Sequence, residues 1–164
     1  MRPSLIRTDA DEITYNLHIM IRFGLETDLL EGKLDLKDLP EAWNARYQSD
    51  LGVHSETDTD GCLQDIHWFC GPIGGSFQGY TIGNVLSIQF FNAALEKAPT
   101  IPQEIEKGAF SLLRNQLQKI LYTHGRSTSP KEVVRTATGK DIDTAPYITY
   151  LKEKYGRIYS IQFE

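Results

Sequence analysis

The sequence predicts a mainly α-helical protein. Apolar residues recur every three or four positions along most of the chain, Gly or Pro follows most of these periodic segments, and alternating strand patterns are nearly absent. A period near 3.6 is typical of a helix that buries one face, and Gly and Pro are the residues that end it. We therefore expect one multi-helix unit over residues 1–164, with room for one short β ribbon near a glycine-rich loop.

The first helix is expected to begin at Asp9. Asp9 is a good N-cap acceptor, and Glu12 stands three residues later, where it could complete a capping box. Apolar residues then follow at every fourth position from Ile13 to Leu29, and Gly32 supplies a stop. The pattern indicates a long helix that is buried along one side.

A second helix is expected from about Leu39 through Tyr47. Pro40 suits the first helical turn, and Trp43 and Tyr47 share one face. Gly52 is placed to close this helix.

Two loops are expected around the middle of the chain. Residues 53–60 have no apolar periodicity and are rich in turn formers, which indicates an exposed loop. Residues 71–79 are glycine-rich, and glycine permits backbone conformations and close approaches that other residues do not.

The second half of the chain contains two further apolar patterns of helical period. One runs over residues 85–95 and ends at Ala98-Pro99, and the other runs over residues 110–121 and ends at Gly125. Both are expected to be core helices.

Two more helices are expected near the end of the chain. Ser129 is a candidate N-cap with Pro130 at the first helical position, and Gly139 would end this short helix. The last helix should begin at about Ala145 and carry apolar or aromatic residues at positions 148, 151, 155 and 158.

Charge and hydropathy exclude several classes of function. The chain has 17 Lys and Arg against 22 Asp and Glu, a formal charge of -5, so no general basic field is present to hold nucleic acid. Its apolar runs are far shorter than the roughly 20 residues that cross a bilayer. The N-terminal segment lacks the pattern of a secretory signal, so we expect a cytoplasmic protein without nucleic-acid or membrane partners.

The metal-binding residue types are sparse. Cys62 and Cys70 are the only cysteines, and their spacing is not that of a structural zinc site; a bridge between them is a minor alternative. The four histidines, His18, His54, His67 and His124, show no HExxH spacing. The sequence predicts no metal ligands in this chain.

The densest group of chemically reactive residues lies at positions 61–68. His67, together with Tyr80 further along, could donate hydrogen bonds to a developing oxyanion, and Asp65 could fix the tautomer of a neighbouring imidazole. The alternative is that His67 and Trp68 are core residues whose polar atoms are satisfied at a helix end.

A second group lies at the start of the chain, where Arg7 and Asp11 are four residues apart. The simplest interpretation is a local ion pair. The alternative is that Arg7 grips a substrate carboxylate through its planar guanidinium while Asp11 orients it.

Taken in order, these two groups resemble motifs of the carboxypeptidase Taq family of zinc metallocarboxypeptidases, family M32. Residues 6–11 read IRTDAD and resemble its IRxxAD motif, and residues 61–68 read GCLQDIHW and resemble its GxxQDxHW motif. Segments 12–19, 39–44, 124–126 and 150–156 are also similar to the family.

The resemblance implies a helical enzyme with a deep cleft that removes single amino acids from peptide C-termini by means of a zinc-activated water. It implies that Arg7 binds the terminal carboxylate, that His67 donates to the scissile carbonyl oxygen, and that Gln64 and Asp65 shape this site. Asp11 and Trp68 would support it structurally. Ser76 stands where the family often has Tyr, so the transition-state hydroxyl would come from Tyr80 or be absent.

The resemblance also implies that the chain is the C-terminal part of such an enzyme. The family motifs HPF, DxRxT, HExxH and HESQ, which carry the zinc ligands and the general base, precede IRxxAD and are missing here. We expect zinc in the complete enzyme, but none bound to this chain alone, and no activity without an N-terminal partner polypeptide. The alternative is a non-catalytic helical module that associates with itself or with another protein.

Overall fold

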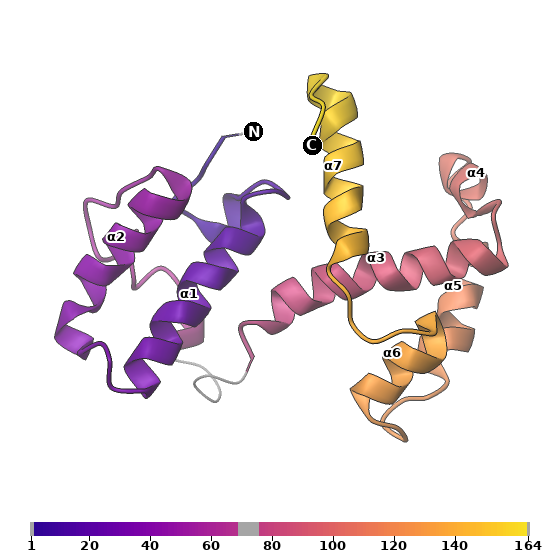
Figure 1. Cartoon of the computed structure of the whole chain (residues 1–164), viewed down its shortest axis with the longest axis horizontal. Coiled ribbons are helices and arrows are strands. Elements are labelled where there is room, and N and C mark those ends of the chain that lie inside the picture. The colour runs from indigo at the N-terminus through magenta and orange to yellow at the C-terminus, as the bar shows by residue number, and fades with distance from the viewer. Residues whose placement is uncertain (1, 69–75, 164) are drawn as a thin grey trace. The chain divides into compact units, whose positions relative to one another are not determined.

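The computed structural model describes residues 2–68 and 76–163, and it confirms the helical fold class. These residues form seven α-helices and a few shorter helical segments, with no strand among them (Figure 1). Residues 71–75 of the glycine-rich loop and Cys70 lie outside the described part of the chain. The short ribbon considered near this loop therefore has no counterpart in the residues that flank it.

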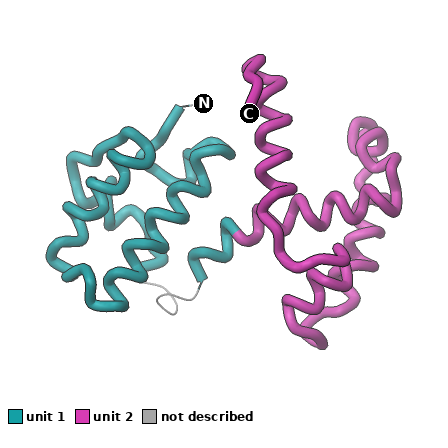
Figure 2. Tube along the Cα trace, in the orientation of Figure 1, with its two compact units in different colours: residues 1–81 teal, residues 82–164 magenta. Residues whose placement is uncertain are grey.

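The chain divides into two compact units, residues 1–81 and 82–164 (Figure 2). The single helical unit expected from the sequence stays a prediction.

Unit 1 is built on two helices that lie side by side, α1 (Tyr15–Leu30) and α2 (Leu39–Leu51) (Figure 1). Trp43 of α2 is almost fully buried and stacks on Tyr47 with ring centroids 4.6 Å apart. Short 3-10 segments at Arg7–Asp9, Leu36–Asp38 and Ile66–Trp68 complete the unit. Its apolar core consists of Ile21, Leu25, Leu39, Trp43, Tyr47, Leu51 and Cys62.

The start of α1 differs from the prediction. Asp9 belongs to a 3-10 segment and does not cap the helix, and the capping box expected with Glu12 is wrong. Asp11 instead caps the turn that leads into α1, because its Oδ1 accepts hydrogen bonds from the amides of Ile13 (3.0 Å) and Thr14 (2.9 Å). Asp9 lies in the preceding 3-10 turn, where its amide donates to the Ile6 carbonyl at 3.1 Å.

The second helix and the loop after it mostly agree with expectation. Gly52 ends α2 with φ = 70°, a left-handed conformation that suits glycine. Residues 53–60 are largely exposed, but Ser55 is only 2% exposed. Its amide donates to Asn44 Oδ1 at 2.9 Å, which ties this loop to α2.

Unit 2 contains most of α3 (Gly79–Lys97), a helix whose first three residues belong to unit 1. It also contains the short helices α4 (Ile101–Glu106) and α5 (Ser111–Leu117), and a π segment at Gln118–Tyr122 continues α5. The last two helices are α6 (Pro130–Thr138) and α7 (Ala145–Tyr159).

One expectation for this half is confirmed, and another is wrong. Helix α3 ends just before Ala98-Pro99 as predicted, and the chain then forms α4, which was not predicted, with its fully buried Ile101 packed against Ala94 and Ala98. Helix α5 was expected in the core, yet it has no buried residue and Phe110 before it is 60% exposed. Leu112 and Leu113 of α5 pack against the cluster of Ala94, Ala98 and Ile101, but this contact leaves both side chains only partly buried.

The last two helices begin where the sequence predicts. Ser129 and Glu132 form a complete capping box on α6, and Gly139 ends that helix with φ = 73°. In α7 the buried side chains are Tyr147 and Tyr155. The expected apolar positions 148 and 158 are exposed, so the helix is rotated relative to the predicted stripe.

Candidate functional site

Arg7 is held in place by two groups within unit 1. Its Nη1 donates a hydrogen bond to Tyr15 Oη at 3.1 Å, and its Nε lies 3.6 Å from Asp65 Oδ2. The Arg7 side chain is 16% exposed and that of Asp65 only 6%. The ion pair expected with Asp11 is not formed, because Asp11 caps α1 while the fold brings Asp65 to the guanidinium.

Three aromatic rings surround the same guanidinium. Its Cζ lies 5.1 Å from the ring centroid of Tyr80, 5.5 Å from that of Phe77 and 5.9 Å from that of Tyr15. Cations are attracted to the faces of aromatic rings at such distances. These contacts hold the Arg7 guanidinium in a fixed, partly buried position.

Asp65, His67 and Tyr80 form a chain of hydrogen bonds. Asp65 Oδ1 accepts from the His67 amide at 3.0 Å and contacts His67 Nδ1. On the other side of the ring, His67 Nε2 lies 3.0 Å from Tyr80 Oη. Phe77 packs edge-on against both rings, with centroids 5.2 Å from His67 and 5.7 Å from Tyr80.

The Asp65 carboxylate is ionised at neutral pH. Burial by itself would raise its pKa, but the hydrogen bonds from the His67 amide and ring, together with the charge of Arg7, outweigh burial and lower the pKa below its ordinary value. The site thus places one buried negative charge between a guanidinium and an imidazole.

Gln64 connects the two sequence motifs. Its Nε2 donates to the carbonyl oxygens of Leu5 (3.0 Å) and Asp60 (2.7 Å). Because Leu5 lies two residues before Arg7, this side chain fixes the N-terminal segment beside the loop that carries Asp65. The geometry assigns Gln64 a supporting contact within the site.

Trp68 belongs to a buried layer behind the site. Its Nε1 donates to the Cys62 carbonyl at 2.6 Å, and the guanidinium carbon of Arg22 lies 3.1 Å from the Trp68 ring centroid. Arg22 is only 1% exposed and forms an ion pair with Glu26 at 3.1 Å. This buried pair could not be predicted from the sequence, since charged residues within a helix usually indicate its solvent-exposed face.

His18 lies in the same buried region, away from the hydrogen-bond chain of His67. Its Nδ1 is 3.0 Å from Tyr47 Oη, and the two rings meet edge-on. Burial, together with the positive charge of Arg7, lowers the pKa of His18 to about 4, so its ring is neutral at physiological pH. A neutral, nearly inaccessible ring fits a structural role.

Sequence reasoning missed Tyr15 and Phe77, which contact the predicted site residues directly. Tyr15 opens α1 eight residues after Arg7, and Phe77 lies at the end of the glycine-rich loop. Only the regular occurrence of aromatic residues beside both motifs could have suggested them.

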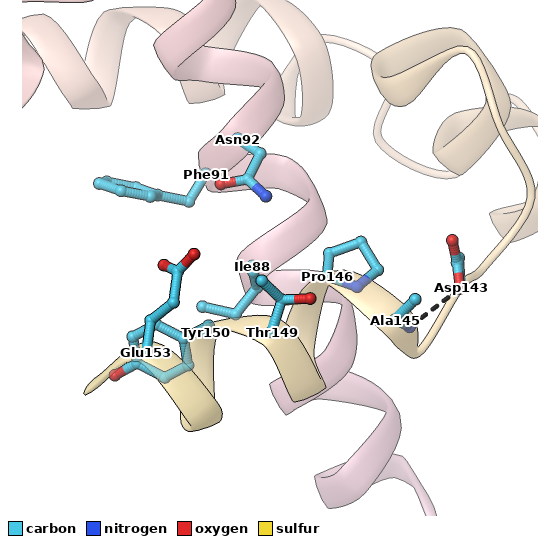
Figure 3. Close-up of a pocket in the computed structure, with 9 residues that line it drawn as sticks. All are labelled: Ile88, Phe91, Asn92, Asp143, Ala145, Pro146, Thr149, Tyr150 and Glu153. Atoms are coloured by element: carbon cyan, nitrogen blue, oxygen red, sulfur yellow. Dashed lines mark hydrogen bonds between the residues drawn. The ribbon is translucent and has the colours of Figure 1, made fainter. Parts of the chain in front are cut away.

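A separate groove of about 710 Å³ lies in unit 2 between α3 and α7 (Figure 3). It contains none of the site residues predicted from the sequence. A hydrogen bond from the Ala145 amide to Asp143 Oδ1 (2.9 Å) shapes one end of the groove. Its lining residues are Ile88, Phe91, Asn92, Asp143, Ala145, Pro146, Thr149, Tyr150 and Glu153.

Two further properties concern residues 2–68 and 76–163. No three His, Cys, Asp or Glu side chains among them come together in a way that could hold a metal ion. Within the same residues, every helix is too short or too polar to cross a membrane.

The comparisons with known proteins agree with one another. The sequence profile of the carboxypeptidase Taq (M32) metallopeptidases matches residues 1–155. The chain is 36% identical over 158 residues to carboxypeptidase 1 of Bacillus subtilis and 38% identical over 159 residues to thermostable carboxypeptidase 1 of Thermus thermophilus. These matches cover 96% and 97% of the chain, but only 31% of each relative.

A solved structure gives the same result. The crystal structure of an M32 carboxypeptidase from Deinococcus radiodurans matches 98% of this chain with a TM-score of 0.94 and 50% identity, over 32% of its own length. The chain thus spans about a third of the length of the proteins that it matches.

Proposed function

This chain belongs to the carboxypeptidase Taq (M32) family of metallopeptidases, and we propose that it forms the C-terminal part of such an enzyme, the part that binds the C-terminus of a peptide substrate. The observation that carries the proposal is Arg7, a guanidinium held between Asp65, Tyr15 and aromatic rings. A guanidinium fixed in this way is suited to gripping a carboxylate through two parallel hydrogen bonds.

His67 and Tyr80 would act beside Arg7 on the scissile peptide bond. Both rings are partly exposed, and Asp65 holds the imidazole from behind. We expect His67 to donate a hydrogen bond to the carbonyl oxygen as negative charge develops on it, which stabilises the transition state more than the bound substrate. Gln64 and Asp65 would hold the two motifs in fixed positions relative to each other.

The metal of the family does not fit the described residues of this chain. Their His, Cys, Asp and Glu side chains do not gather into a set of three, and a catalytic zinc needs about three protein ligands. We therefore propose that zinc is held by another part of the complete protein, either in one polypeptide or in a separate N-terminal partner. The isolated chain should neither bind zinc stoichiometrically nor hydrolyse peptides.

A reconstituted enzyme tests the proposal. The chain would be joined to the N-terminal part of a family member, and release of C-terminal amino acids would be measured. His67→Ala should lower kcat about a hundredfold, which corresponds to roughly 3 kcal/mol in the transition state, with little change in KM or zinc content. Normal turnover in a folded His67→Ala protein would indicate that His67 and Trp68 have a purely structural role.

The same assay tests the role of Arg7. Arg7→Lys keeps the charge but loses the paired donors, so kcat/KM should fall and discrimination against C-terminally amidated peptides should weaken. Arg114→Lys, in helix α5 of unit 2, is the matched control and should leave both properties unchanged. Unaltered discrimination in Arg7→Lys would contradict the assignment of the carboxylate to Arg7.

One observation favours the second candidate function, a helical module that associates with a partner or with itself. Large apolar side chains are exposed on both units, among them Leu36, Phe110 and Ile158. Exposed apolar surface favours association. A strictly monomeric chain at high concentration in sedimentation, with no binding of a hydrophobic dye, would count against this candidate.

A further inference from the structure

Both ring nitrogens of His67 are engaged within the site. Nδ1 contacts Asp65 Oδ1, and Nε2 lies 3.0 Å from Tyr80 Oη. A neutral imidazole has one N–H donor and one lone-pair acceptor, so the direction of one hydrogen bond decides the direction of the other.

Asp65 decides this direction. Its lowered pKa keeps the carboxylate ionised at neutral pH, and an ionised carboxylate can only accept hydrogen bonds. The bond therefore runs from His67 Nδ1–H to Asp65 Oδ1, the oxygen that also accepts from the His67 amide. In the neutral ring Nε2 then carries a lone pair and no proton, so the Tyr80 hydroxyl must donate the hydrogen bond to it.

We infer that Asp65 and Tyr80 together hold neutral His67 with its proton on Nδ1, so that His67 donates a hydrogen bond to a ligand oxygen only after Nε2 has also been protonated. The inference rests on the proposed function for the identity of that oxygen, the scissile carbonyl. While its hydroxyl donates to Nε2, Tyr80 acts through His67 as a positioning residue and competes with the ligand for that nitrogen; to act on the scissile bond, as proposed above, the hydroxyl must first leave Nε2.

Long-range proton–nitrogen NMR spectra of the full chain, with nitrogen-15 in its histidines, test the inference without any need for enzymatic activity. The spectra show which ring nitrogen carries the proton when the ring is neutral. We expect Nδ1–H for His67, whereas His124, whose ring contacts no fixed carboxylate among the described residues, should favour Nε2–H. A neutral His67 ring protonated on Nε2 would overturn the inference.

Two variants separate the contributions. Tyr80→Phe should keep the proton on Nδ1 but shift the Nε2 resonance, because the hydroxyl donor is gone; Tyr122→Phe, an exposed tyrosine of unit 2, should shift neither. Asp65→Asn should reduce the preference for Nδ1–H. An unchanged Nε2 resonance in Tyr80→Phe would overturn the part assigned to Tyr80, even if Asp65→Asn failed to fold.

The outcome is independent of the reconstituted enzyme. Failure of that enzyme to cleave peptides would count against the proposed function and would leave the position of the His67 proton as measured. Conversely, an active enzyme whose neutral His67 carried its proton on Nε2 would support the function and refute this inference.

Discussion

The two units of the chain bury different kinds of side chain. Unit 1 encloses a stacked Trp43 and Tyr47 together with the charged Arg22, whereas the smaller core of unit 2 centres on Ala94, Ala98 and Ile101. Every side chain that we assign to the candidate site lies in unit 1, on short segments backed by that aromatic core. A binding site must hold its donors in one geometry, and a dense layer behind them supplies the support.

Unit 2 leaves more of its apolar periodicity exposed. Helix α5 has no buried residue, and α7 exposes Ile148 and Ile158. A similar apolar pattern is thus deeply buried in α1, at Ile21 and Leu25, but only partly buried in α5, at Leu112 and Leu113, depending on how much of it another element covers.

The largest expected effect would break the core of unit 1. Trp43→Ala removes a nearly inaccessible indole and should lower the free energy of unfolding by about 3–5 kcal/mol. Urea unfolding followed by far-ultraviolet circular dichroism measures the loss, and hydrogen exchange locates it. Exchange should accelerate in α1 and α2; equal acceleration in α5 and α6 would contradict the separation of the units.

The buried ion pair provides the next test. Arg22→Met removes the cation that pairs with the buried Glu26 carboxylate, and this should cost about 3 kcal/mol. The double variant Arg22→Met/Glu26→Leu should recover most of the loss, because neither charge remains in the core. Chemical unfolding measures the stability of the single and double variants. A double variant no more stable than the single one would show that the broken ion pair does not cause the loss of stability.

The pH dependence of stability should also come mainly from unit 1. The pKa of His18 is about 4 in the folded chain and about 6.5 in the unfolded chain. The contribution of neutral His18 to the free energy of unfolding is therefore fully present above pH 6.5. It is lost as the pH falls from 6.5 through 4, because the unfolded chain binds the proton first, and the total loss is about 3 kcal/mol.

Unfolding experiments across this pH range measure the effect of His18. His18→Gln should flatten the curve between pH 4 and 6.5, whereas His124→Gln, in unit 2, should leave it unchanged. If the stability of His18→Gln fell with pH as steeply as that of the unsubstituted chain, the pH dependence would come from other groups.

The smallest effect concerns a local feature of unit 2. Ser129→Ala removes the side chain that accepts from the Glu132 amide at 3.3 Å at the start of α6 and should cost about 1 kcal/mol. Thermal unfolding measures the change, and Ser129→Asp, which keeps an acceptor, should restore the stability. A loss in Ser129→Ala as large as that of Trp43→Ala would show that α6 matters far more than its exposure suggests.

Local signals in the sequence were sufficient for several elements. Ser129 with Pro130 at one end and Gly139 at the other bound α6 where expected, and Gly52 closes α2. The motif residues Arg7 and His67, which are 60 positions apart, were also identified from sequence, because the family resemblance depends on residue identity and order. Their roles in binding and catalysis remain predictions.

Other features were decided by the tertiary structure. Arg7 pairs with Asp65, and Arg22 enters the core beside Trp68. Neither partner can be read from neighbouring residues, since each depends on which distant segment packs against the helix or loop. The sequence by itself determined where most helices begin and end, because caps and stops act within a few residues. The tertiary structure decided which charges are buried and which donors face the site, because these depend on contacts between residues far apart in the chain.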